Sequence, residues 1–425
     1  MGGSPPQFGD GPALPLMPEL APSRVPRTFR ALRHRNFRLF IGGQIVSLIG
    51  TWMQNVAQAW LVYRLTHSEL LLGTAWFCSQ IAVFVLGPLG GIAADRFSRR
   101  KVVIVTQTLS MAQAFVLAAL TLSGRVQVWH VLVLAGALGA INAFDMPGRQ
   151  ALVIQMTGKE DLINAISLNS AVFNAARIVG PAIAGLLLAV VGEGTCFLIN
   201  GVSFLAVILS LTAMRIAPAA PKAPEPMWRR LVDGFRYASH HSAVRRVLAL
   251  MGCATLSSMP GLVLMPFFAE DIFHRGARGL GILMGAMGAG AVVGTLTLAR
   301  RTRVSGLGRV MAIGGLTTGA CYLAFAFSPF FYLSLALMPL VGFSAMRQMA
   351  SANTTIQTLI PDEYRGRIMA LYSMTVVGLG PFGSLAAGAL AGRIGARATM
   401  GAGSVLALVS SLIFAWSLRR DPIAA

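Results

Sequence analysis

The residue of this chain best placed to do chemistry is Arg177, a cation near the middle of an apolar segment. A charged side chain at that depth is costly unless it is paired or faces a polar cavity. The sequence offers no acidic residue at matching depth, because Asp145 and Glu193 fall at opposite ends of their own apolar segments. We therefore expect Arg177 either to bind an anionic substrate or to donate to backbone carbonyls near Pro181.

Two apolar segments also carry polar side chains along one face of the expected helix, at about 100° per residue. Polar groups inside a membrane helix usually face the protein interior. We expect these faces to line a substrate cavity, with hydrogen bonding between helices as the alternative. They comprise Gln44, Ser47, Thr51, Asn55 and Gln58 in the first segment and Ser167, Ser170, Asn174 and Arg177 in the second.

A third group of chemically active side chains lies between Gly91 and Lys101, where the carboxylate of Asp95 stands among four cations. Asp95 can accept backbone N–H groups at the positive end of a helix, and the cations can bind a carboxylate on a neighbouring helix. The four cysteines lie singly in different apolar segments, without the spacing of a metal or redox site. We therefore expect no metal, no cofactor and no enzyme activity.

The elements that position these side chains are membrane-spanning helices. Of the 425 residues, 55% are hydrophobic and 12% charged, whereas soluble domains carry about 25% charged residues. A helix that crosses a membrane needs about 20 mostly apolar residues. Twelve segments qualify, at 39–62, 70–93, 102–122, 128–145, 163–190, 195–214, 245–268, 279–299, 308–327, 330–349, 368–391 and 398–418.

The second half of the chain repeats the first. Residues 154–190 begin with Ile-Gln and rise into an apolar helix that carries Gly180-Pro181, and residues 356–392 do the same with Gly380-Pro381. A half-length repeat in a membrane chain predicts two pseudosymmetric halves that hold a substrate between them. The expected parts are an N-terminal arm 1–36, a six-helix half 37–214, a linker 215–244, a second six-helix half 245–418 and a tail 419–425.

The formal net charge of +20 is explained by topology. Most Lys and Arg residues fall in the arm, the even-numbered loops and the tail, which predicts that both termini are cytoplasmic. Their partner is then anionic lipid, and no nucleic-acid partner is expected. Within the linker, residues 227–241 form an amphipathic basic segment that suits either a helix on the membrane surface or a solvated linker helix.

The motifs now point to a family. The stretch from Gly91 to Lys101 resembles the signature loop G-x-L-A-D-R-x-G-R-K of the major facilitator superfamily, with Ala93 and Ser98 as departures. Residues 361–372 are similar to the P-D/E-x-x-R-G-R stretch of its bacterial branch of enterobactin exporters and macrolide-efflux proteins. The resemblance implies an all-α fold of twelve transmembrane helices and a cytoplasmic latch between the halves. The implied latch residues are Gly91, Asp95, Arg96, Arg100, Lys101, Asp145, Arg365 and Arg367.

We expect Asp95 to cap the helix that begins near Arg365 and Arg367, and Arg96 or Arg100 to pair with Asp145. Small residues and prolines in the two repeated helices should allow close packing. These are Gly180, Pro181 and Gly185 in the first half and Gly380 and Pro381 in the second. The run from Gly180 to Gly185 also resembles the end of the antiporter motif of exporters, although a packing motif without directional meaning is the alternative.

The sequence thus predicts a monomeric secondary transporter in the bacterial cytoplasmic membrane. It should export a small amphiphilic or anionic metabolite, of the siderophore or antibiotic class, by alternating access. Exchange for protons follows from the resemblance alone, since no acidic carrier is visible deep in the first span. A nutrient importer of the same fold and a non-transporting receptor or scaffold are the alternatives.

Overall fold

The computed structural model describes residues 27–158, 160–215, 235–299 and 306–421, and these form helices joined by short turns. A short helix η1 (Arg27–Arg33) precedes the first half. That half consists of α1 (Arg35–Thr66), α2 (Glu69–Arg96), α3 (Arg99–Leu122), α4 (Val128–Thr157) and α5 (Leu162–Thr212). The expected N-terminal arm up to residue 26, most of the linker and residues 422–425 lie outside the described residues.

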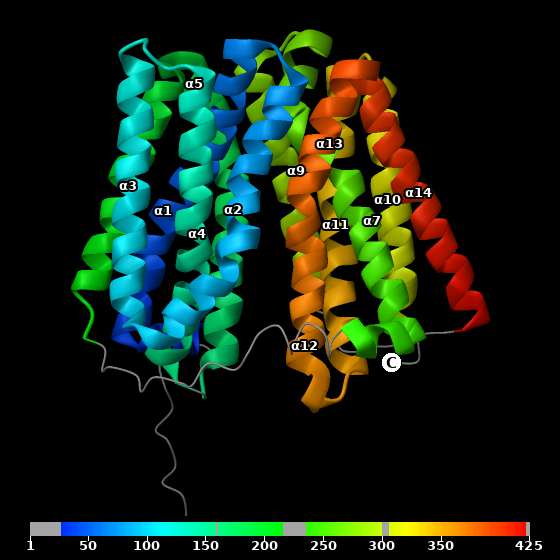
Figure 1. The fold of residues 1–425 in the computed structure, drawn as a ribbon, viewed down its shortest axis with the longest axis horizontal. Coiled ribbons are helices and arrows are strands. Elements are labelled where there is room, and N and C mark those ends of the chain that lie inside the picture. Colours follow the sequence, from blue (N-terminus) through cyan, green and yellow to red (C-terminus); the bar gives the residue numbers. More distant parts are fainter. Residues whose placement is uncertain (1–26, 159, 216–234, 300–305, 422–425) are drawn as a thin grey trace, which may run out of the picture.

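The second half is built in the same way and lies beside the first (Figure 1). Its first span is α7 (Ser242–Val263) continued by α8 (Met265–Phe267) and η2 (Phe268–Ile272). There follow α9 (Gly276–Ala299), α10 (Leu307–Phe327) and α11 (Phe331–Leu359). The last two spans are α12 (Asp362–Ser373) with η3 (Met374–Gly378) and α13 (Leu379–Ile394), and then α14 (Ala396–Arg420).

The predicted twelve-span architecture is confirmed. Ten helices in the described part of the chain are long and apolar enough to cross a membrane. Among them α5 has 51 residues and supplies two crossings, because Gly192 bends it with φ +74° and ψ 177°, a backbone conformation that glycine adopts readily. The remaining crossing is α1, whose 32 residues suffice in length while its polar face lowers its hydropathy.

The helix α4 is longer than expected, and this changes the place of two charged residues. The sequence analysis ended the fourth span at residue 145, near the membrane surface, but α4 continues to Thr157. Asp145 is therefore 1% exposed inside the first half, and Arg149 lies one turn further along the same helix. Asp145 thus lies within α4 and not at its end.

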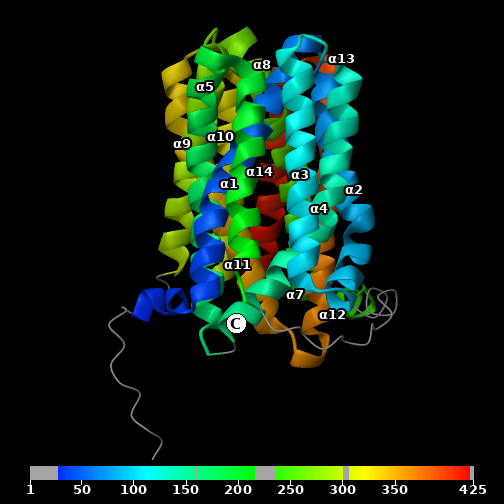
Figure 2. The same ribbon diagram turned by 90° about the vertical axis from the view of Figure 1, so that its left-hand side faces the viewer.

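Both halves pack their helices in the same order, as a half-length repeat requires. In the first half α2 packs on α4 and α3 on α5, and in the second α9 packs on α11 and α10 on α14. The halves meet along α2 with α13 and along α5 with α9. The described chain begins and ends at one end of the bundle, shown at the bottom of Figures 1 and 2. We call this the linker end.

Candidate functional site

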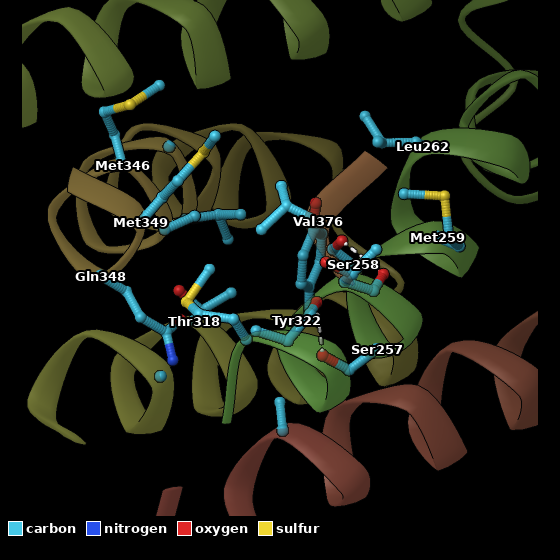
Figure 3. A pocket seen from close by; sticks show the side chains of 18 of the residues that line it. Ser257, Ser258, Met259, Leu262, Thr318, Tyr322, Met346, Gln348, Met349 and Val376 are labelled. Carbon is cyan, nitrogen blue, oxygen red and sulfur yellow. Dashed lines mark hydrogen bonds between the residues drawn. The ribbon is translucent and has the colours of Figure 1, made fainter. Parts of the chain in front are cut away.

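A cavity of about 210 Å³ lies between the halves, and nearly all of its wall comes from the second half. The wall is mostly apolar and carries scattered hydroxyl and amide groups (Figure 3). Methionine supplies a large share of the apolar surface, and its flexible thioether adapts to ligands of different shape. The methionines are Met251, Met259, Met287, Met346 and Met349.

The polar groups of the second half differ in whether they are already satisfied. Ser257 and Ser258 donate to carbonyls of their own helix, at 3.0 and 2.9 Å. The hydroxyls of Thr318 and Ser344 bond each other at 2.8 Å. Gln348 is 4% exposed, and its Nε2 has no hydrogen-bond partner among the described residues. An unpaired buried donor is costly, and Gln348 Nε2 is packed beside Gly315 of α10.

Arg177 is the contribution of the first half to this cavity. It projects from α5, and its guanidinium carbon lies 5.8 Å from the centre of the Trp52 ring. Within the described part of the chain Arg177 forms no ion pair or side-chain hydrogen bond with a protein group. The bond to carbonyls near Pro181 that the sequence left open is therefore absent from this structure. One cation thus faces an otherwise uncharged wall.

The other predicted cavity residues do not line this cavity. Thr51 donates to the carbonyl of Ser47 at 2.9 Å, and Asn174 to that of Ser170 at 2.8 Å. Ser167 bonds within its own helix in the same way. Asn55 and Gln58 are half-buried along α1. Thr51, Ser167 and Asn174 thus satisfy their own helices, which is neither the predicted cavity lining nor the alternative of hydrogen bonding between helices.

A polar network fills the interior of the first half instead. Asp145 Oδ1 accepts from Thr106 at 2.8 Å and from Gln107 at 2.9 Å, and its other oxygen pairs with Arg149. Arg149 also donates to Gln44 Oε1 at 3.1 Å. The expected pairing of Asp145 with Arg100 is not seen, since Arg100 binds the carbonyls of Leu211 and Thr212 at 2.7 and 2.8 Å.

A small cavity of about 40 Å³ adjoins this network. Its volume exceeds the roughly 10–15 Å³ that one water needs. Asp145 and Arg149 line it together with Asn142, Ser110 and Thr51. The network therefore has room for water beside a buried carboxylate.

The halves touch closely at the end opposite the linker end. A Cβ added to Gly73 of α2 would lie 3.0 Å from the Cα of Gly388 in α13. A Cβ added to Gly185 of α5 would lie 2.7 Å from the Cα of Gly281 in α9. The two glycine pairs join equivalent helices of the repeat, and Tyr63 adds a hydrogen bond to Asp271 at 2.9 Å. This end is closed.

At the linker end the predicted latch is not engaged. Asp95 is exposed, with no hydrogen bond or ion pair to a described residue. The segment α12, which carries Arg365 and Arg367, packs against α11 and η3 of its own half. Gly91 has open space around it. The bond between Asp95 and the start of α12 stays a prediction for a conformation in which this end closes.

The predicted packing residues fall into two groups. Gly180 packs against the Cβ of Trp52 in α1, and Gly185 against α9. Pro181 is buried inside α5, where its carbonyl adjoins Gly281. Gly380 has no neighbour within 4 Å of an added Cβ, although Pro381 beside it is buried.

The comparison with protein families decides the identity of the fold. The model of the family described as transmembrane secretion effector matches residues 27–421, which is nearly all of the chain. The chain belongs to this family, a branch of the major facilitator superfamily.

The relatives of this chain are transporters. It is 24% identical to the staphyloferrin A transporter of Staphylococcus aureus, over 82% of this chain and 87% of that protein. It is 28% identical to the multidrug efflux pump Tap of Mycolicibacterium fortuitum, over 82% and 88%. The enterobactin exporter EntS of Shigella boydii is 25% identical, over 86% of each chain. The chain is therefore a secondary transporter of small molecules and a multi-pass membrane protein.

Solved structures agree on the fold. A bacterial homologue of the human lysosomal transporter Spinster, in an inward-facing and occupied conformation, superimposes with a TM-score of 0.70. The match covers 93% of this chain and 98% of that one, at 11% sequence identity. At this identity the likeness concerns the fold alone.

Most residues of the cavity wall were not predicted from the sequence. Tyr322, Gln348 and the methionines sit in apolar helices, where such side chains usually belong to the core. A second cation, Arg347, lies within α11, and its Nε is buried without a partner among the described residues. The repeat was the one signal that could have directed attention to these helices, because it makes the second half an equal partner in the site.

Proposed function

We propose that this protein exports a small amphiphilic anion of the siderophore or drug class. The observation that carries the proposal is Arg177, a cation without a counter-ion among the described residues, in a cavity wall without a carboxylate. A guanidinium without a protein counter-ion favours an anionic ligand. The methionine-rich wall suits an apolar body of variable shape. The names of the three relatives support this substrate class.

The arrangement also supports alternating access. The cavity is walled by the second half and capped by one residue of the first, so movement between the halves changes its walls and its charge. We propose that the linker end is cytoplasmic, in keeping with the charge asymmetry, and that the structure described here is open to the inside. The cavity and the latch residues belong to one chain, which supports a monomer in the bacterial cytoplasmic membrane.

We propose further that protons drive export and that Asp145 carries them. Its carboxylate is buried, adjoins a cavity with room for water, and pairs with Arg149 of the same helix. Protonation of Asp145 would release Arg149 towards Gln44, and deprotonation would restore the pair. Such a switch changes the packing inside the first half, where α1 and α4 meet.

The test is substrate binding and flux in proteoliposomes that contain the wild type, Arg177→Ala or Arg177→Lys. Enterobactin and staphyloferrin A serve as anionic ligands, and a cationic and a neutral drug as comparisons. Loss of a charge-assisted bond of about 1.5–3 kcal/mol should weaken anion binding roughly 10- to 150-fold in Arg177→Ala. Lys should restore part of it, because the charge returns without the planar fork.

The matched control is Arg275→Ala, which removes another arginine that lies over aromatic rings, at the closed end. It should leave anion affinity unchanged. Binding of cationic or neutral compounds alone would reject the anion class. Inward flux from the outer face would favour a nutrient importer, and binding without any flux would favour a receptor or scaffold.

A further inference from the structure

The outer face of the first half carries a groove that the transport cycle does not explain. It lies where α2 ends and α3 begins, and α4 completes its wall. Its volume is about 760 Å³, larger than the cavity between the halves. The groove is lined by Ala93, Arg96, Phe97, Ser98, Lys101, Val102, Val105, Thr106, Leu109, Ala140, Ile141 and Phe144. These residues all come from the first half, so the groove is separate from the substrate cavity.

The groove is amphipathic along its length. Its linker end carries Arg96 and Lys101, and its deeper part is apolar. Leu109 lies eight residues beyond Lys101 on α3, which corresponds to about 12 Å along the helix. Three of its apolar side chains are strongly exposed, with Phe97 at 62%, Val105 at 56% and Leu109 at 50%. An apolar surface of this kind below a charged rim fits a ligand with a polar head and a long apolar tail.

The four cations of the loop fall into two groups, because two bind backbone carbonyls and two line the groove. Arg99 and Arg100 donate to backbone carbonyls of Ala151 and of the end of α5. Arg96 and Lys101 are exposed, line the groove, and form no ion pair or hydrogen bond with the described residues. Two positive charges at the mouth, without an acidic residue in the groove wall, select a negatively charged head group.

From this charge complementarity we infer that an anionic glycerophospholipid occupies the groove, with its phosphate between Arg96 and Lys101 and an acyl chain along Val105, Leu109 and Ile141. The groove lies at the boundary where the loop leaves the apolar helices, which is the depth of a lipid head group. A zwitterionic lipid would fill the same apolar surface but would bring a positive group to the two cations. The lipid is held by the first half alone, so it would not be carried across with the substrate.

Bound lipid would also act on the conformation of the transporter. Arg96 and Lys101 belong to the loop expected to latch the halves when the linker end closes. A phosphate that holds them in the groove favours the state described here, because a ligand shifts a population towards the state it binds better. The lipid site and the latch would then compete for the same side chains.

The experiment measures lipid affinity of the purified full chain in detergent by native mass spectrometry. Phosphatidylglycerol and phosphatidylcholine with identical acyl chains are added in turn, to the wild type and to Arg96→Gln/Lys101→Gln. At about fivefold in affinity for each cation near an anionic lipid, the double variant should lose roughly 25-fold for phosphatidylglycerol and little for phosphatidylcholine. The matched control is Arg309→Gln/Arg419→Gln, which removes two exposed cations from the second half and should leave both affinities unchanged.

A second variant tests the groove itself. Val105→Trp fills the apolar part of the groove while leaving both cations in place. It should lower the affinity for phosphatidylglycerol with long acyl chains and leave that for a short-chain phosphatidylglycerol unchanged. Equal wild-type affinity for the two head groups would overturn the inference, as would an unaltered preference for phosphatidylglycerol in Arg96→Gln/Lys101→Gln. Unchanged long-chain affinity in Val105→Trp would place the lipid elsewhere.

Discussion

Tyr63 of α1 donates a hydrogen bond of 2.9 Å to Asp271 of η2 and so ties the two halves together at the closed end. Tyr63 is 2% exposed, and its ring meets the edge of Phe267 with centroids 5.5 Å apart. A buried hydroxyl that bonds a carboxylate across the interface must separate from it when this end opens. The contact is therefore a gate whose strength bears on the balance between the two conformations.

Tyr63→Phe should shift the transporter towards the state that is open at this end. The ring remains, and only the bond to the carboxylate is lost, which is worth about 1.5–3 kcal/mol or roughly 10- to 150-fold in the equilibrium. Electron spin resonance distances between labels at Leu70 and Leu390, in a chain without other cysteines, report the opening. Tyr332→Phe, an exposed tyrosine at the same end, is the control. An unchanged distance distribution in Tyr63→Phe would show that the bond does not hold the gate.

Gly185→Ala should prevent full closure of the same end. The new methyl group would lie 2.7 Å from the Cα of Gly281, and a backbone atom cannot move aside as a flexible side chain can. Overpacking of this kind costs about 1–3 kcal/mol, enough to populate the open state and slow the cycle. Gly392→Ala, where nothing lies within 4 Å, should leave both flux and label distances unaltered. Equal flux in the two variants would contradict a close-packed interface.

Some of these features could be predicted from sequence and others could not. The spans and the repeat follow from local apolar patterns, which is why they agree with the structure. The end of α4 does not follow from such a pattern, because the apolar run breaks at Asp145. Only the structure shows that Thr106 and Gln107 of α3 bond this carboxylate inside the bundle. The sequence analysis therefore placed Asp145 at the end of its helix, whereas it lies within α4.

The gate and the cavity wall depend on docking between the halves. Tyr63 and Asp271 are 208 positions apart, and no local pattern pairs them. Tyr322 and Gln348 look like ordinary residues of apolar helices until the structure places them in the wall of the cavity that Arg177 also lines. Contacts of this kind are set by tertiary packing, which a single sequence does not display.

The short helix η1 should release from α5 at low pH. Burial raises the pKa of Asp161, but the hydrogen bond from His34 and the charges of Arg33 and Arg30 outweigh it and hold the pKa below its ordinary value of 3.8. A carboxyl with a lowered pKa stabilises the fold above its ordinary value, and this stabilisation is lost as pH falls through the lowered one. The protection factors of the amides of residues 27–34, which correct for the intrinsic pH dependence of hydrogen exchange, should therefore fall below about pH 4.

Asp161→Asn should remove this pH dependence and leave these amides poorly protected at neutral pH as well. The control is Glu160→Gln, since Glu160 is 87% exposed and 3.7 Å from Arg33, a pair worth little in solvent. It should keep the wild-type profile. If Asp161→Asn retained strong, pH-dependent protection of these amides, the cluster at the start of α5 would not be what anchors η1.

Asp145→Asn should uncouple transport from the proton gradient. Asparagine keeps the size of the side chain, and its oxygen can still accept from Thr106 and Gln107, but it can no longer gain and lose a proton or neutralise Arg149. Flux driven by a pH gradient should fall to that of empty liposomes, whereas exchange of labelled for unlabelled substrate without a gradient should persist.

Glu193→Gln is the control, because Glu193 pairs with Arg64 at the closed end and is not proposed to carry protons. Breaking a buried pair costs about 3–5 kcal/mol, so thermal unfolding of Asp145→Asn is measured alongside, and Asp145→Glu should restore part of the gradient-driven flux. A folded Asp145→Asn protein that still concentrates substrate against a pH gradient would show that the proton is carried elsewhere.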